Sequence, residues 1–186
     1  APALLDPSAA AAVVLSIGLR LSGEEYRNPA GAQTFRGKLG KAVLPEDFTL
    51  VDDPNQVEFA GKLLVGHYEF DDQGVPPERV TLIERGVLKS VLLSRYPVIG
   101  KSKSNGHGRS FAGYAPEGMP GALFLTARKT HTEAQLLERL RAECRKRGKP
   151  YGIWVRKLRN FSQQQGTTSQ AAIRFMGGLL YLVDAK

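Results

Sequence analysis

The stretch at residues 70–89 constrains the fold of this chain more than any other. Its first half gathers two Asp, one Gly and two Pro at 71–77. These residues supply side-chain acceptors, a tolerated positive φ and fixed φ angles, so they predict a tight turn. Its second half predicts a β-hairpin, because apolar residues from Val80 to Val87 flank a short polar tip at 84–86 that contains glycine.

Two helices are marked by the residues at their ends. The first is expected to begin with Asp6 as N-cap, and its sequence is apolar nearly all round as far as Leu19, which predicts burial on most sides. The second has Thr132 as N-cap and Gln135 three residues later, which is a capping box, and Gly148 ends it.

Apolar runs and alternating patterns predict several further strands. They are expected at 48–51, 64–70, 88–93, 121–127 and 151–158, with a closing hairpin of 171–175 and 179–183. A length of 186 residues suits one domain. We therefore expect a single α+β domain over residues 1–186, in which a curved, largely antiparallel and barrel-like sheet of about six to nine strands packs with two main helices.

The net charge of +8 permits binding to anions, but its distribution favours a solvated surface. Basic side chains gather at 139–149 and 156–159, and aromatic residues, 8% of the chain, do not alternate with them as a stacking platform for nucleic acid requires. Nucleic acid is therefore an unfavoured partner.

The sequence shows no pattern of a disulfide, a signal peptide or a membrane span. A single cysteine, Cys144, cannot form an intramolecular disulfide, and its place on the apolar stripe of the second helix predicts a small core residue. The start at 1–7 has no positively charged leader, and the apolar run at 9–21 is too short and too interrupted to span a bilayer. We expect a cytoplasmic location and no membrane contact.

Four separated motifs fall in a recognisable order. They are Asp-Asp-x-Gly-Val-Pro at 71–76, Leu-Ile-Glu-x-Gly-Val-Leu-Lys at 82–89, Ser-Arg-Tyr at 94–96 and Ser-Asn-Gly-His-Gly-Arg at 104–109. The chain thereby resembles the TldD/PmbA family, also called modulators of DNA gyrase. The resemblance implies a relation to zinc metallopeptidases that degrade or mature peptides and carry His-Glu-x-x-x-His on a helix. Family members are longer, so the chain is expected to be a piece, the metal helix plus part of a β-rich C-terminal region.

The zinc motif itself is replaced in this sequence. Aligning 18–24 with the family's Gly-His-x-Leu-x-Gly-(Glu/Asp) places the two histidine positions at Val14 and Leu19 and the glutamate position at Leu15. Valine and leucine have neither a lone pair for zinc nor a carboxylate to act as general base. We therefore expect no catalytic residue and no metal, with apolar groups filling the former site. Glu24 and Glu25 are expected to be solvent-exposed; the alternative for Glu24 is that it keeps a family position near the site.

The segment 101–110 is the most loop-like part of the chain, because Gly, Ser and Asn are frequent in it. By resemblance it lies near the substrate cleft. This makes Asn105, His107 and Arg109 the candidate peptide-binding residues, since a guanidinium or an imidazole can hold a carboxylate or a carbonyl. A plain surface loop is the equal alternative. The remaining histidines, His67 and His131, are expected to be structural.

Three functions stay open at this point. The favoured one is a catalytically silent TldD/PmbA-like domain, naturally degenerate or altered, with a peptide-binding role, a partner-subunit role or a homo-oligomeric state; no cofactor is expected, where family members hold zinc. The second is an active zinc-dependent peptidase or peptide-maturation protein whose ligands come from elsewhere. The third is a basic nucleic-acid-binding module, which rests on net charge alone.

Overall fold

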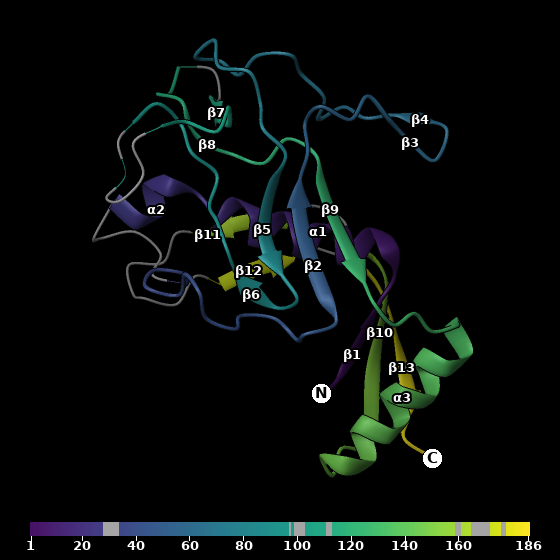
Figure 1. The fold of residues 1–186 in the computed structure, drawn as a ribbon. Helices are drawn as coiled ribbons and strands as arrows, with labels where there is room; N and C mark the ends of the chain where they lie inside the picture. Colours follow the sequence, from purple (N-terminus) through teal and green to yellow (C-terminus); the bar gives the residue numbers. More distant parts are fainter. Residues whose placement is uncertain are drawn as a thin grey trace. The chain divides into compact units, whose positions relative to one another are not determined.

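The computed structural model describes residues 1–27, 34–96, 98, 103–110, 113–158, 161–164, 172–175 and 178–186 (Figure 1). Within these residues the fold is mixed α+β, with three helices and several antiparallel sheets. The chain divides into two compact units. One contains Ala1–Ser16, Lys129–Gly166 and Ala171–Lys186, and the other is built mainly from Ile17–Arg128. No helix in the described ranges has both the length and the apolar character needed to cross a membrane.

The first unit contains a three-stranded sheet with a helix on it. Strand β10 (Tyr151–Leu158) lies in the middle, parallel to β1 (Ala3–Leu5) and antiparallel to β13 (Gly178–Asp184). Helix α3 (Glu133–Lys146) buries Leu140 and Cys144 in one cluster with Ala185.

The predicted start of α3 is confirmed. The Gln135 backbone N–H donates to the Thr132 hydroxyl over 3.3 Å, and the Thr132 N–H donates to the Gln135 side chain over 2.9 Å. The two bonds satisfy donors that the first helical turn leaves free. Cys144 is fully buried, which confirms the prediction of a small core residue.

The predicted closing hairpin is wrong. Strand β13 pairs with β10, with Leu182 opposite Ile153, while β12 (Ala172–Phe175) pairs with β11 (Phe161–Gln164). Adjacent apolar runs separated by glycines favour a local hairpin. The pairing of a strand also depends on strands distant in sequence, and β10 is twice as long as β12, so it offers β13 more backbone hydrogen bonds.

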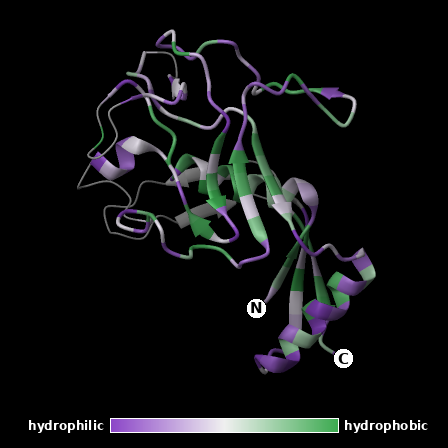
Figure 2. Cartoon of the chain, viewed as in Figure 1, coloured by the Kyte–Doolittle hydropathy of each residue, from purple (hydrophilic) through white to green (hydrophobic). Residues whose placement is uncertain are grey.

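The second unit is organised around a four-stranded antiparallel sheet. Its strand order is β6-β5-β2-β9, from β2 (Phe48–Asp52), β5 (Val80–Glu84), β6 (Val87–Leu88) and β9 (Leu123–Ala127). Apolar residues run along these strands in Figure 2. Leu50, Leu82 and Ile83 are at most 1% exposed, so the sheet supplies the core of this unit.

The hairpin predicted from the central stretch is confirmed. Ile83 lies opposite Leu88 and Glu84 opposite Val87, so the connection has two residues. Arg85 and Gly86 both have positive φ, 47° and 77°, as the mirror-image turns of tight hairpins require.

The remaining elements are short, apart from the first helix. Helix α1 (Pro7–Leu19) begins next to Asp6 as predicted and is followed by a separate helix, α2 (Gly23–Arg27). The Asp6 carboxylate accepts a hydrogen bond from Trp154 Nε1 at 2.8 Å. Two-residue strands complete the set: β3 (Glu58–Phe59), β4 (Lys62–Leu63), β7 (Gly108–Arg109) and β8 (Glu117–Gly118).

Three expectations about the sheet need correction. The described strands form five separate sheets of two to four strands, and they do not make the single barrel-like sheet that was predicted. Residues 64–70 are not a strand, because the His67 N–H donates to Leu64 O in a local turn. Strand β6 ends at Leu88, and the buried residues that follow make isolated backbone contacts, such as Leu92 N–H to Leu21 O.

Candidate functional site

The paired aspartates of the central turn organise the candidate site. Asp71 is 5% exposed, and one of its oxygens accepts from the backbone N–H groups of Gln73 and Val75 at 2.9 and 2.8 Å. Its other oxygen accepts from Gly108 N–H at 2.9 Å. The side chain therefore closes the predicted turn and also binds the loop at 103–110 to it.

Asp72 makes a second connection to the same loop. Its carboxylate accepts from Ser110 N–H at 2.7 Å and lies 3.1 Å from Arg109 Nε. The Ser110 backbone N–H is the main cause that lowers the pKa of Asp72, and the Arg109 charge adds to it. The Asp72 backbone N–H also donates to Gly108 O at 2.9 Å. The aspartate pair was predicted only as turn-forming, and its role in the loop was missed.

Gly106 lets the loop pass close to the prolines of the turn. Its φ is +73°, and a Cβ atom there would lie 2.2 Å from Pro76 O. Only glycine fits such an approach in this backbone conformation. The Tyr68 hydroxyl donates to Gly106 O at 2.9 Å and holds the loop from a third direction.

Asn105, a predicted peptide-binding residue, uses its side chain inside the protein. It is 7% exposed. Its Oδ1 accepts from Leu93 N–H at 2.7 Å and its Nδ2 donates to Val91 O at 3.0 Å. Asn105 therefore satisfies two backbone groups, Leu93 N–H and Val91 O, in the buried segment that follows β6 and lies outside the described strands.

His107, the second predicted residue, is fully buried beside Asp52. Its Nδ1 lies 2.9 Å from Asn105 O, and its Nε2 lies 3.5 Å from Asp52 Oδ1 without a hydrogen bond. Asp52 accepts from Gly121 N–H at 3.0 Å and from Ala122 N–H at 2.9 Å. The imidazole thus links the loop to the end of β2 and is enclosed by protein.

Arg109, the third predicted residue, is the one of the three that reaches the surface, with 37% of its side chain exposed. Its guanidinium lies 4.3 Å from the centre of the Tyr68 ring, a cation–π distance. Burial, and next the charge of Asp52, raise the pKa of Tyr68 well above its usual value, so the hydroxyl stays protonated.

A small hollow opens beside Arg109. Its volume is about 220 Å³, and Tyr114, Glu117 and Met119 line it together with Arg109 and Ala115. Burial raises the pKa of Glu117, and the charges of Glu24 and Glu25 add to the effect. The hollow therefore places one cation and one carboxyl group of raised pKa at a surface that a small group can reach.

Glu24 was expected to be solvent-exposed, and this is wrong. Its carboxylate accepts from the Ser22 hydroxyl at 2.6 Å, from Gly118 N–H at 2.8 Å and from the Ser94 hydroxyl. These partners come from three separate parts of the second unit, so the Glu24 carboxylate joins the start of α2 to the segments that contain Ser94 and Gly118. Glu25 is also held, by an ion pair of 3.1 Å with Arg20, and its side chain is 21% exposed.

The three positions that we predicted to correspond to the family's zinc motif all lie on α1. Val14 and Leu19 are partly buried, and Leu15 is 37% exposed. Their side chains are hydrocarbon and do not fit zinc, which needs lone-pair donors. Within the described ranges, no group of three or more His, Cys, Asp or Glu side chains could hold a metal ion.

The two other histidines have neighbours of their own. His67 Nδ1 lies 2.8 Å from Pro54 O. The exposed His131 accepts a hydrogen bond from the Arg139 guanidinium. His67 thus contacts a backbone carbonyl thirteen residues earlier in the chain, and His131 contacts a side chain eight residues later.

The comparison with protein families covers nearly the whole chain. Residues 1–180 match the model of the PmbA/TldA metallopeptidase C-terminal domain. The chain belongs to this family. The match confirms the TldD/PmbA resemblance seen in the four motifs.

Curated relatives of this PmbA/TldA chain are archaeal proteins named metalloproteases. One from Archaeoglobus fulgidus is 39% identical over 82 residues, which is 41% of this chain. Another from Methanothermobacter thermautotrophicus is 34% identical over 87 residues, 46% of this chain. The matched part spans only 18% of the length of each relative.

Solved structures share the fold of the PmbA/TldA chain at low identity. TldE from Thermococcus kodakarensis superposes with a TM-score of 0.64 at 19% identity, over 98% of this chain and 41% of its own. A protein from Thermotoga maritima, described as a proposed modulator of a DNA gyrase, gives a TM-score of 0.60 at 21% identity, over 86% of this chain and 32% of its own.

Proposed function

We propose that this chain is a catalytically silent domain of the PmbA/TldA family, which binds a peptide or serves as a partner subunit. One observation carries the proposal. In our alignment of residues 18–24 with the family motif, the positions of its two histidines and its glutamate are occupied by Val14, Leu19 and Leu15. A peptidase of this kind needs a bound metal and a general base, and these side chains supply neither.

The contacts of the remaining motifs support a scaffold that is kept around the loop at 103–110. Asp71 and Asp72 still tie the turn to the loop, and Gly106 still fits against Pro76. A family domain that keeps these contacts retains a surface for ligands. Arg109 is the residue of the predicted three that a peptide carboxylate or carbonyl can reach there.

The partner-subunit role is supported by the fold shared with TldE. At 19% identity that likeness concerns the fold alone, so the role itself is our proposal. We also propose that residues 1–186 act as one domain in a cytoplasmic protein, and that nucleic acid is not its ligand.

Zinc content tests the proposal most directly. The protein is dialysed in zinc-containing buffer, freed of excess metal and analysed for zinc per chain. The same is done for a variant with Val14→His, Leu15→Glu and Leu19→His, and for a matched control with Val14→Asn, Leu15→Gln and Leu19→Asn, which is equally polar but lacks imidazole and carboxylate. Far-UV circular dichroism confirms that each variant is folded.

We expect no zinc in the parent and in the control, and about one zinc per chain in the histidine variant. One zinc per chain in the parent would overturn the proposal. It would favour instead an active zinc-dependent peptidase whose metal ligands come from other residues. The Archaeoglobus relative is named a metalloprotease. Failure of the histidine variant alone to gain zinc would refute the alignment of α1 with the metal helix.

A further inference from the structure

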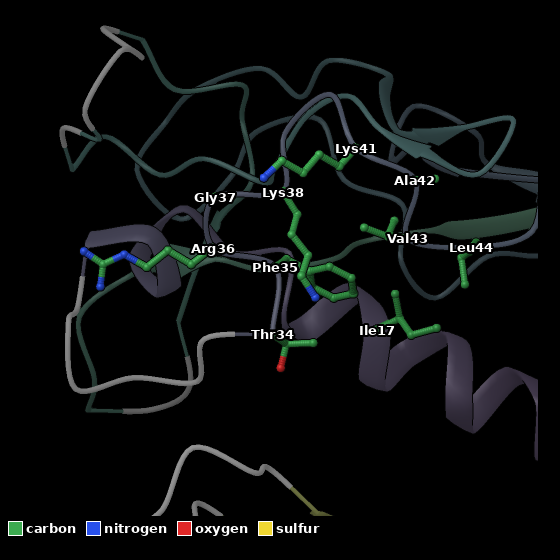
Figure 3. Close-up of a pocket in the computed structure, with 10 residues that line it drawn as sticks. All are labelled: Ile17, Thr34, Phe35, Arg36, Gly37, Lys38, Lys41, Ala42, Val43 and Leu44. Atoms are coloured by element: carbon green, nitrogen blue, oxygen red, sulfur yellow. The ribbon is translucent and has the colours of Figure 1, made fainter.

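A second hollow lies in the second unit. It has a volume of about 610 Å³, within the range of small-ligand sites. Figure 3 shows its lining: Ile17 from the last turns of α1, and the segment between α2 and β2 that follows. The lining residues of that segment are Thr34, Phe35, Arg36, Gly37, Lys38, Lys41, Ala42, Val43 and Leu44.

One part of this hollow is apolar. Ile17, Phe35 and Val43 are each partly buried and border the same space in Figure 3, and Leu44 extends the surface. Ile17 lies on α1 between Val14 and Leu19, the positions that we aligned with the family's metal motif. An apolar group of a ligand can therefore be taken out of water next to this helix.

The rest of the hollow is cationic. Lys38 and Lys41 are exposed, and neither ammonium has an ion-pair partner within the described ranges. Arg36 lines the hollow as well, and no acidic side chain is among its described lining residues. Two uncompensated cations beside an apolar floor suit a ligand with an apolar body and one anionic end.

The segment that carries both lysines is held in place before any ligand arrives. Gly40 N–H donates to Leu88 O at 2.8 Å, and Leu88 N–H donates to Lys41 O at 3.0 Å. Val43 N–H donates to Gly86 O at 2.8 Å. The hollow is thus fastened to the β5–β6 hairpin, so a ligand does not have to order it on binding.

A further bond fixes the opposite end. The Tyr26 hydroxyl donates to Phe35 O at 2.6 Å, which ties the start of the segment to α2. Gly37 has φ of +68°, so the chain turns between Phe35 and Lys38 in a conformation that glycine adopts readily. As a result Phe35 of the apolar part and the two lysines, Lys38 and Lys41, lie on one preformed loop.

We propose that this hollow binds the C-terminal end of a peptide. The last side chain, if apolar, occupies the floor formed by Ile17, Phe35 and Val43, and the terminal carboxylate pairs with Lys38 and Lys41. The proposal rests on the peptide-binding role proposed above, and it specifies which end of the peptide is read and by which residues.

The test compares two peptides that differ only at the terminus. A short fluorescein-labelled peptide ending in Leu-Phe is prepared with a free carboxylate and as its amide, and binding to the full chain is followed by fluorescence anisotropy. We expect the free acid to bind about ten- to a hundredfold more tightly, because a charged acceptor is lost in the amide. Its affinity should fall as salt is added.

Variants identify the site. Lys38→Gln with Lys41→Gln should weaken the free acid by a similar factor and leave the amide unchanged. The matched control, Lys62→Gln with Lys129→Gln, removes the same charge from exposed positions outside the hollow and should bind like the parent.

Any of three outcomes would overturn the proposal. They are no measurable binding of the free acid by the parent, equal binding of acid and amide, and binding that the Lys38 and Lys41 changes leave unaffected. The zinc content of the parent is measured on the same preparation. It decides whether the domain is catalytically silent independently of the peptide result, so the two proposals fail separately.

Discussion

Replacing Asp71 by Asn should destabilise the second unit far more than the same change at Asp72. Asp71 is buried, and both of its oxygens accept hydrogen bonds from backbone N–H groups, of which that of Gly108 is buried as well. Asparagine keeps the shape of the side chain but offers one oxygen and no charge. If its oxygen stays with Gln73 and Val75, its amide nitrogen faces the Gly108 N–H, donor against donor.

The contacts set the size of the effect. Two hydrogen bonds fall from charge-assisted to neutral strength, about 1 kcal/mol each, and the third is lost with its donor left buried, about 1–3 kcal/mol. The expected loss is therefore about 3–5 kcal/mol in the free energy of unfolding. At Asp72, whose side chain is 33% exposed, solvent screening limits the loss to about 1 kcal/mol.

Urea unfolding followed by far-UV circular dichroism measures both variants against the parent. The midpoint should fall strongly for Asp71→Asn and slightly for Asp72→Asn, with the slope of the transition unchanged. Hydrogen exchange at the Gly108 amide should accelerate in the Asp71 variant. Equal midpoints for the two variants, or a loss below about 1 kcal/mol at Asp71, would refute the role assigned to this carboxylate.

Two further predictions follow from single contacts. The lowered pKa of Asp72 means that its stabilising effect is complete above the unfolded-state pKa, near 4, and disappears as pH falls through the folded-state value. The difference in urea midpoint between the parent and Asp72→Asn should therefore be full at pH 7 and shrink as the pH is lowered below 4, and a difference that grows in acid would contradict this. A Cβ added at Gly152 would lie 2.7 Å from Leu140 Cδ1 and 2.9 Å from Cys144 Sγ, so Gly152→Ala should cost about 1–3 kcal/mol by overpacking, and an unchanged melting temperature would count against it.

The features that were predictable from sequence depend on neighbours along the chain. The hairpin tip at 84–86 requires positive φ at adjacent residues, and the capping box needs only Thr132 and Gln135 at the right spacing. Both were found. The pairing of β13 with β10 was not, since it is decided by which distant strand presents a free edge.

The candidate site shows the same division. A loop rich in Gly, Asn and Ser predicts exposure, yet Asn105 and His107 are buried. What buries them is distant in sequence: Asp71 accepts the Gly108 N–H, and Asp52 lies beside the imidazole. The aspartates were visible in the sequence, but their second use, across more than thirty residues, is a tertiary contact that no local pattern indicates.

The parallel pairing of β1 with β10 has a consequence for synthesis. Ala3 lies opposite Ile153, so the strand made first must wait for a partner 150 residues later. At about 5–20 residues per second a ribosome takes roughly 8–30 s to provide it. During that interval β1 lacks its partner β10, while Ile17–Arg128, contiguous in sequence, can already form its own sheet. We therefore expect the two units to fold in sequence on the ribosome, with the unit that contains β1 and β10 completed last.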